Sequence, residues 1–287
     1  MTAKGRRWHL VAPVLLAVLS GCASPPPPQS AADRRLEQAN QAHERASAAL
    51  TRGEYNTALR HYQATLDRSA AVEDQNESAI SMLNIAAAQH RSGNYAAVRS
   101  TLLALIAHEP PFAASYIGRA EARLSLVELQ QNRVDEATLH AARAEQLCPA
   151  GACPWWLALQ NIMTEIDLRR GDLGAADIRV RVTLAAAGRG TERREEANAW
   201  RLLGEIEARR GRLDEARRAL LTALDIDGKL EVPERIALDL ISLARLEAAS
   251  GDREAGRRYA RRAAAVAEAA KLAAVLAQAH ALLATAK

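Results

Sequence analysis

Aromatic residues are scarce in this chain of 287 residues, which contains one Phe, five Tyr and four Trp. The apolar share of the sequence is nevertheless 49%, and much of it is alanine. Alanine is the best helix former, and its small side chain lets two helices approach each other closely. The composition therefore favours a large core of closely packed helices over one built around aromatic rings.

The motifs of common catalytic sites are also missing. The sequence has no His-Glu-x-x-His, no Gly-x-Ser-x-Gly and no phosphate-binding glycine loop. Six histidines are scattered over the expected helices without a paired acid or nucleophile nearby, and we interpret them as surface or groove residues: His43, His61, His90, His108, His140 and His280. We expect neither an enzyme nor a cofactor, and the alternative is a catalytic site assembled from distant parts of the chain.

An excess of basic charge is absent once the first 21 residues are set aside. The whole chain has 38 Lys and Arg against 34 Asp and Glu. Lys4, Arg6 and Arg7 lie in residues 1–21, which hold no acid, so removing them leaves 35 basic against 34 acidic residues. Nucleic-acid binding requires a sustained basic surface, and we do not expect it. The paired arginines of the second half are interleaved with acids, which indicates a solvated helix face rather than a patch for nucleic acid or anionic lipid.

Turn-forming residues recur at a fixed interval. Six of them are separated by 40, 39, 39, 40 and 40 residues: Gly53, Gly93, Asn132, Gly171, Gly211 and Gly251. A small residue stands seven positions before nearly every turn residue and another five positions after it: Ala46, Ala86, Ser125, Thr164, Gly204 and Ala244, then Ala58, Val98, Ala137, Ala176, Ala216 and Gly256. Small residues at fixed places on two consecutive helices allow close antiparallel packing. The sequence therefore predicts six stacked helical hairpins.

The helix boundaries follow from this register and from the positions of Gly and Pro. First helices are expected at 33–52, 75–92, 112–131, 155–170, 192–210 and 233–250. Second helices are expected at 54–70, 94–108, 133–147, 172–187, 212–226 and 252–268. Connections between hairpins are expected at Pro110, Pro111, Pro149, Pro154, Gly188, Gly190, Gly228 and Pro233. The stretch from Leu272 to Ala286 then predicts a helix that caps the stack.

The first residues have the pattern of a secretory signal. The basic segment Lys4 to Arg7 is followed by an apolar run, Leu10 to Leu19, that is too short to span a bilayer. Leu19-Ser20-Gly21-Cys22 resembles the lipobox of bacterial lipoproteins. That resemblance implies cleavage after residue 21 and acylation of Cys22, which would anchor the chain in a membrane. The alternative is an ordinary signal peptide that happens to end in cysteine.

The residue after Cys22 and the segment that follows it complete this prediction. Ala23, rather than Asp, favours the outer membrane in the sorting rule of that family, with the protein facing the periplasm. Residues 22–32 contain four consecutive prolines, Pro25 to Pro28, and predict an extended polyproline II tether. A docking site for another protein is the alternative for this segment.

Only two cysteines remain beyond Cys22. Cys148 and Cys153 lie in a predicted connection between helices, and an oxidising periplasm could join them in a disulfide. A metal site is not expected because no further Cys and no suitably spaced His completes it. A redox motif is not favoured because four residues, rather than two, separate the cysteines.

The fifth repeat carries the clearest family resemblance. Trp200, Leu203, Gly204, Gly211, Leu213, Ala216, Leu220 and Ala223 resemble the pattern of tetratricopeptide repeats (TPR). The period of about 40 residues is longer than the 34 of that family. The resemblance implies an all-α fold for residues 33–287, namely a right-handed α-solenoid of about six TPR-like hairpins with a C-terminal capping helix.

The same resemblance implies that the first helices line a concave groove for a partner's extended segment or helix. Projection from the turn residues gives the inward-facing positions: Ile80, Leu83, Asn84, Ala87, His90 and Arg91 in copy two; Arg119, Ala122, Arg123, Leu126 and Leu129 in copy three; Asn161, Ile162, Glu165, Leu168 and Arg169 in copy four; Asn198, Arg201, Leu202, Glu205 and Arg209 in copy five. Asn and Arg can hold a peptide backbone or a carboxylate. The clamp pattern of chaperone-tail binders is not reproduced. For each position the alternative is an ordinary solvated residue.

Two functions are compatible with these features. The first is an outer-membrane lipoprotein adaptor that binds an envelope protein and helps to assemble a secretion, pilus or transport complex, as TPR lipoproteins similar to type IV pilus pilotins do. The second is a carrier that holds a lipid or another hydrophobic ligand against the apolar groove positions, to which Leu238 and Ile241 also belong. An adaptor predicts an open polar groove, and a carrier predicts an enclosed apolar cavity.

Overall fold

The computed structural model describes residues 31–148, 153–188, 190 and 192–285. The predicted signal peptide, Cys22 and the prolines of the tether lie outside the described residues. The chain divides into two compact units, Met1–Gln38 and Ala39–Lys287. The second unit contains the repeats, and it alone is considered below.

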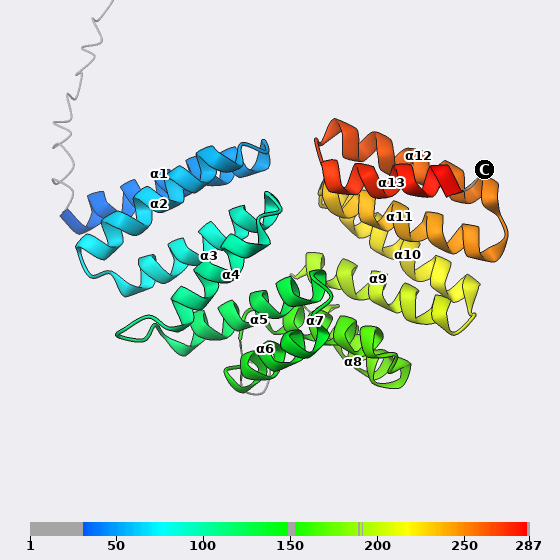
Figure 1. Cartoon of the computed structure of the whole chain (residues 1–287), viewed down its shortest axis with the longest axis horizontal. Coiled ribbons are helices and arrows are strands. Elements are labelled where there is room, and N and C mark those ends of the chain that lie inside the picture. The colour runs from blue at the N-terminus through cyan, green and yellow to red at the C-terminus, as the bar shows by residue number, and fades with distance from the viewer. Residues whose placement is uncertain (1–30, 149–152, 189, 191, 286–287) are drawn as a thin grey trace, which may run out of the picture. The chain divides into compact units, whose positions relative to one another are not determined.

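The described residues form helices and no strands, which confirms the predicted fold class. The first helices of the hairpins are α1 (Ala31–Thr51), α3 (Gln75–Arg91), α5 (Ala114–Gln130), α7 (Trp156–Arg170), α9 (Arg193–Arg209) and α11 (Pro233–Ser250). The second helices are α2 (Tyr55–Ala71), α4 (Tyr95–Ile106), α6 (Val134–Gln146), α8 (Leu173–Ala187), α10 (Leu213–Lys229) and α12 (Arg253–Ala269). Helix α13 (Ala273–Thr285) follows as the capping helix (Figure 1). Within this described part of the chain, no helix combines the length and the apolar character needed to cross a membrane.

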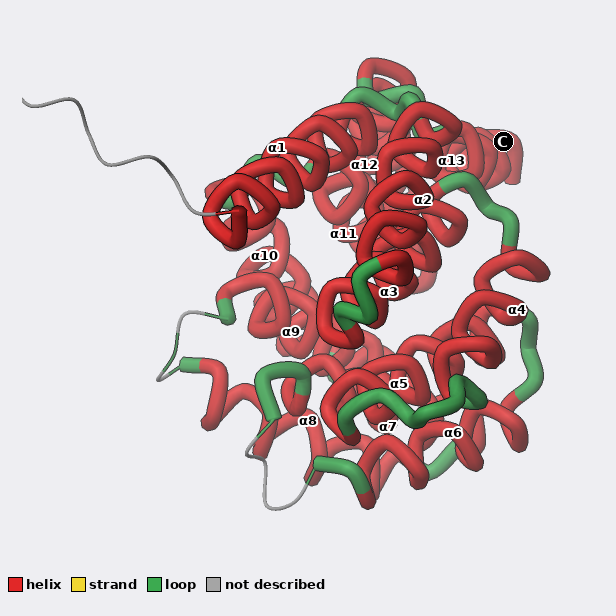
Figure 2. The backbone as a smooth tube through the Cα atoms, turned by 90° about the vertical axis from the view of Figure 1, so that its left-hand side faces the viewer, coloured by secondary structure: helices red, strands yellow, loops and turns green. Residues whose placement is uncertain are grey.

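The helices pack in the order of the chain. From α2 onward each helix contacts the next one, as Figure 2 shows for their arrangement along the chain. From α3 onward each odd-numbered helix also contacts the next odd-numbered helix, whereas the even-numbered helices of the described chain have no comparable contact with one another. We call the side formed by α3, α5, α7, α9 and α11 the odd-helix face.

The turn within each hairpin has the expected left-handed conformation. All six turn residues have a positive φ, between 60° at Asn132 and 94° at Gly251. At Gly211 the carbonyl groups at the end of the helix find hydrogen-bond donors in the turn. The amides of Gly211 and Arg212 donate to the carbonyls of Ala208 and Glu207 at 3.0 and 2.9 Å. Glycine or asparagine at these positions tolerates the conformation that ends a helix in this way.

Three turns between hairpins use the same conformation without glycine. Glu73, Glu231 and Lys271 have φ values of 56°, 53° and 57°. The prediction that α10 stops near residue 226, with Gly228 in the connection, is therefore wrong by about one turn. Helix α10 includes Gly228 and ends at Lys229, and the chain reverses at Glu231.

The small residues meet where the sequence places them. All twelve positions, seven before and five after the turns, are buried. In the third hairpin the Ser125 hydroxyl donates to the carbonyl of Ala137 at 2.7 Å. In the sixth, a Cβ added to Gly256 would lie 3.0 Å from the carbonyl oxygen of Ala244. The small residues at these positions thus allow the two helices of one hairpin to pack closely against each other.

Candidate binding site on the odd-helix face

Most of the predicted groove residues remain accessible on the odd-helix face. Arg91, Arg119, Arg169, Glu205 and Arg209 are exposed, and the partly exposed ones are Ile80, Asn84, Ala87, His90, Arg123, Leu126, Ile162, Glu165, Asn198, Arg201 and Leu238. Their role in binding a partner stays a prediction.

Seven of the predicted groove residues are instead buried. They are Leu83, Ala122, Leu129, Asn161, Leu168, Leu202 and Ile241. The apolar ones belong to the hydrophobic clusters between hairpins; for example, Leu83 packs with Leu102 and Leu124. Projection from the turn residues predicts which side of a helix faces away from the other helix of its own hairpin. It does not predict how much of that side the next hairpin buries, and these residues are buried for that reason.

Polar side chains connect successive odd-numbered helices across the face. Arg209 Nη1 donates to the Leu168 carbonyl at 2.7 Å, and Arg169 Nη1 lies 3.5 Å from the Leu129 carbonyl. In the preceding interval His90 Nε2 and Gln130 Oε1 are hydrogen-bonded at 2.7 Å. These links hold the side chains of the face in fixed positions relative to their neighbours.

The arginines of α7 and α9 are neutralised by acids of the same helix. Arg169 pairs with Glu165 at 3.0 Å, and Arg209 pairs with Glu205 at 2.6 Å. Burial raises the pKa of Glu165, and the charge of Arg169 opposes that rise. The corresponding positions of α3 and α5 carry Ala87 and Leu126, so these two helices lack the acid.

Arg201, a predicted groove residue, lies in an internal ion cluster. Its side chain is only 17% exposed and reaches two fully buried carboxylates, Asp227 at 3.1 Å and Asp239 at 2.5 Å. Asn198 Oδ1 accepts a further bond from Arg201 at 2.8 Å. Burial raises the pKa of Asp239 to about 6 and raises that of Asp227, while Arg201 opposes both shifts. Arg201 is therefore fixed by its own fold and is not a free contact for a partner.

A second set of acids was missed by sequence reasoning. Glu128, Asp167, Glu207 and Glu247 each stand four residues before a turn residue and are 39, 40 and 40 residues apart. They pair with arginines of the even-numbered helices or of the turns before them, and three of them, Glu128, Glu207 and Glu247, reach back to the preceding hairpin. The pairs are Arg99 and Arg133 with Glu128, Arg179 with Asp167, Arg181 and Arg212 with Glu207, and Arg217 with Glu247. Burial alone would raise the pKa of Glu128, but bonds from Arg133 and Arg99 hold it below its usual range. The regular spacing of these acids was the signal that could have revealed them.

His140 departs from the predicted surface or groove position. It is 7% exposed, and its Nδ1 lies 2.5 Å from Glu121 Oε2, so it does have a paired acid. The pair lies between α5 and α6 of one hairpin, where it contributes to packing. Elsewhere in the described chain, no group of three His, Cys, Asp or Glu side chains is arranged to hold a metal ion.

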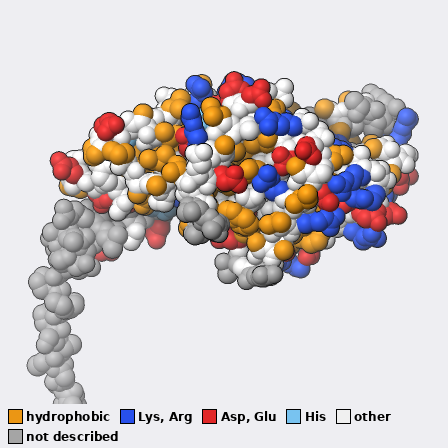
Figure 3. Space-filling view, turned by 90° about the horizontal axis from the view of Figure 1, so that it is seen from below, with side chains coloured by type: hydrophobic (Ala, Val, Ile, Leu, Met, Phe, Trp, Pro, Cys, Tyr) orange, Lys and Arg blue, Asp and Glu red, His pale blue; other side chains and the backbone are white. Residues whose placement is uncertain are grey.

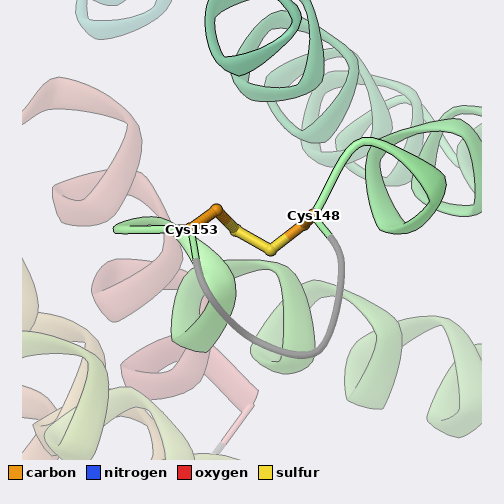
Figure 4. Close-up of a disulfide and its surroundings, with 2 residues drawn as sticks. All are labelled: Cys148 and Cys153. Carbon is orange, nitrogen blue, oxygen red and sulfur yellow. A yellow bond between two sulfur atoms is a disulfide. The ribbon is translucent and has the colours of Figure 1, made fainter.

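The two remaining cysteines are joined. Cys148 and Cys153 form a disulfide at the connection between α6 and α7, with Cα atoms 5.4 Å apart (Figure 4). Cys148 is buried and Cys153 is partly exposed. The predicted position of this disulfide, in the connection between the third and fourth hairpins, is confirmed.

Charges of both signs are mixed on the surface. Figure 3 shows one side of the molecule, on which blue and red side chains lie close together and apolar side chains gather between them. Most of the arginines described above have an acidic neighbour within ion-pair distance, such as Arg181 with Asp177 at 2.8 Å.

Comparisons with known proteins identify the fold. No protein-family model matches the sequence, and no curated protein matches it. Among solved structures, the apo form of RapI has a TM-score of 0.68 at 12% identity, over 81% of this chain and 84% of RapI. A signal-transduction ATPase (STAND) protein with a tetratricopeptide repeat sensor, from Pyrococcus horikoshii, has a TM-score of 0.56 at 12% identity, over 86% of this chain and 38% of that one. PilW, a type IV pilus biogenesis factor, has a TM-score of 0.54 at 15% identity, over 79% and 92%. The chain thus has the fold of TPR-like helical repeat proteins.

Proposed function

We propose that this chain is a lipid-anchored adaptor of the bacterial outer membrane, and that its odd-helix face binds a protein partner in the periplasm to assemble an envelope complex. The observation that carries this proposal is the ordered polar character of the face. Arg209 and Arg169 are held against carbonyls of the neighbouring helix, as described above. Side chains that are fixed before binding lose little conformational entropy on binding, which favours recognition of a specific partner.

The membrane anchor rests on the sequence around Cys22. A basic segment, a short apolar run and Leu19-Ser20-Gly21-Cys22 together support acylation of that cysteine. PilW, which shares the fold, is a type IV pilus biogenesis factor, and this supports examining pilus and secretion complexes first. Replacement of Cys22 by Ser should move the protein from the membrane fraction to the soluble fraction. A variant that still sediments with membranes would contradict the anchor.

The carrier function has less support because its expected lining is largely buried. Leu83, Leu129, Leu168, Leu202 and Ile241 pack between hairpins and are not available to a ligand. The four that stay partly exposed, Ile80, Leu126, Ile162 and Leu238, lie on four separate helices. An adaptor that contacts a partner at isolated apolar points fits this arrangement better than an enclosed lipid site.

Site-specific photocrosslinking in intact cells tests the adaptor function. We expect a photoreactive residue at Leu126 or Asn198, on the odd-helix face, to capture one defined envelope protein. The same residue at the exposed Arg218, on α10, is the matched control and should not capture it. Equal capture from all three positions, or from none, would contradict the proposal. A stoichiometric lipid found by native mass spectrometry of the purified protein would favour the carrier.

A further inference from the structure

Two arginines on α5 lack an acid of the kind that accompanies Arg169 on α7 and Arg209 on α9. Arg119 and Arg123 stand one helical turn apart, so they lie on the same side of α5. No carboxylate of the described chain lies within ion-pair distance of either one. Glu121, between them in sequence, points to the other side and pairs with His140 at 2.5 Å. The two positive charges are therefore uncompensated, in contrast to Arg169 and Arg209.

The Arg123 side chain is also partly buried. Its Nη1 donates to the main-chain carbonyl of Leu83 on α3, which accounts for one of the five guanidinium donors. Burial and, next, the charge of Arg119 lower the pKa of Arg123 to about 10. A partly buried cation beside a second cation is costly unless an anion approaches it.

The surroundings of this pair are suited to a protein segment. The bond to Leu83 brings the guanidinium to the backbone next to Asn84, a partly exposed residue whose side-chain amide lies 3.4 Å from His43 Nδ1. Ile80 stands one turn before Asn84 on α3, and Leu126 stands three residues after Arg123 on α5; both are partly exposed. A free inorganic anion would use the arginines alone, whereas an acidic residue with apolar neighbours would use all of these groups.

We propose that Arg119 and Arg123 form a docking site for an acidic segment of the partner protein, in which an Asp or Glu carboxylate lies between the two guanidinium groups and an adjacent apolar side chain contacts Ile80 or Leu126. Arginine presents parallel N–H donors that match a planar carboxylate. This inference rests on the adaptor function proposed above and names the chemistry of its partner.

Fluorescence anisotropy tests the site with a defined probe. The full chain, held in nanodiscs of uncharged phosphatidylcholine, is titrated against a labelled peptide of four Glu-Leu repeats and against its Gln-Leu counterpart. We expect the Glu-Leu peptide to bind and the Gln-Leu peptide to bind at least about tenfold more weakly. Arg119→Gln and Arg123→Gln should each weaken Glu-Leu binding by about tenfold.

Two control variants make the result specific. Arg218 is an exposed arginine on α10, outside the odd-helix face, and it pairs with Glu215 at 3.2 Å, so Arg218→Gln should leave peptide binding unchanged. Arg119→Gln removes an exposed side chain and should fold normally; Arg123→Lys keeps the charge and should retain part of the affinity.

The outcomes separate this inference from the adaptor function. Absence of Glu-Leu binding, or an equal loss in Arg218→Gln, would overturn the inference. Displacement of the peptide by millimolar inorganic phosphate would assign the site to free anions and would also overturn it. If photocrosslinking at Asn198 still captures an envelope protein in that case, the adaptor function stands without this site.

Discussion

Arg201 Nε donates to Asp239 Oδ1 at 2.5 Å and thereby joins the fifth hairpin to the sixth. Arg201 Nη2 also donates to Asp227 at 3.1 Å, so one arginine serves two buried carboxylates. Asp227 Oδ1 and Asp239 Oδ2 have no hydrogen-bond partner. Arg235 and Arg194 add positive charge nearby, and Glu195 adds negative charge beside Arg235. The cluster therefore has one carboxylate more than Arg201 alone can neutralise.

This cluster should make the stability of the protein depend on pH. The folded state raises the pKa of Asp239 to about 6, above its value in an unfolded chain. The folded state therefore binds more protons, and the stability that protonation contributes is present at about pH 4 and is lost as the pH rises through about 6. We expect the free energy of unfolding to fall from about pH 5 to about pH 7 in the wild type and to change less in Asp239→Asn.

Chemical denaturation at several pH values measures this effect, and the difference between variants removes contributions from other groups. Asp225→Asn is the control, because Asp225 is on the same helix as Asp227 but pairs at the surface with Lys229. An identical pH dependence in the wild type and Asp239→Asn would contradict the prediction.

The buried acid of the last hairpin should matter more than a surface acid. Glu247 is 4% exposed and accepts bonds from Arg217 at 2.6 and 2.9 Å, which lower its pKa. Glu247→Gln should reduce the free energy of unfolding by about 1 to 3 kcal/mol at neutral pH. Glu215→Gln, which breaks the exposed pair with Arg218, should change it by less than about 0.5 kcal/mol. Equal effects of the two substitutions in urea denaturation would argue against the proposed importance of burial.

Two glycines inside helices should respond to alanine in opposite directions. At Gly256 a Cβ would lie 3.0 Å from the Ala244 carbonyl and 3.3 Å from the Ala248 amide nitrogen, both of them backbone atoms. At Gly228 a Cβ would have no neighbour within 4 Å. We expect Gly256→Ala to destabilise the protein by about 1 kcal/mol, because the close approach of the helices is lost. We expect Gly228→Ala to stabilise it by about 0.5 to 1 kcal/mol through helix propensity. Thermal unfolding of both variants would show whether the signs differ.

The disulfide should stabilise the connection between the third and fourth hairpins. Cys148→Ser together with Cys153→Ser should lower the free energy of unfolding by about 2 to 3 kcal/mol, because the bond restricts the unfolded chain. Peptide mapping of the periplasmic protein without reduction should identify the joined cysteines. A reducing agent should destabilise the wild type and leave the double variant unchanged; if both respond equally, the disulfide does not have this role.

The accuracy of sequence reasoning differed between the backbone and the binding face. The turn residues predicted every hairpin, and most helix ends lie within two residues of expectation, because glycine or asparagine occupies the positive-φ position within each of the six hairpins. The turns at Glu73, Glu231 and Lys271 could not be predicted from a glycine or asparagine, because other residue types have a positive φ at these positions. On the odd-helix face the sequence placed Arg209 and Leu168 in one groove. In the structure Leu168 is buried, and its carbonyl accepts a bond from Arg209.

The sequence by itself determined the repeat length, the sites of chain reversal and the small residues at which the two helices of a hairpin touch. These features are local, because each depends on the conformational range or the size of one side chain. Only the tertiary structure decided which polar groups neutralise one another. Arg201 pairs with Asp227 and Asp239, which lie up to 38 positions away in sequence but on neighbouring helices. Arg119 and Arg123, in contrast, have no acid within ion-pair distance in the described chain. The chemistry of the binding face is therefore a property of how the hairpins stack.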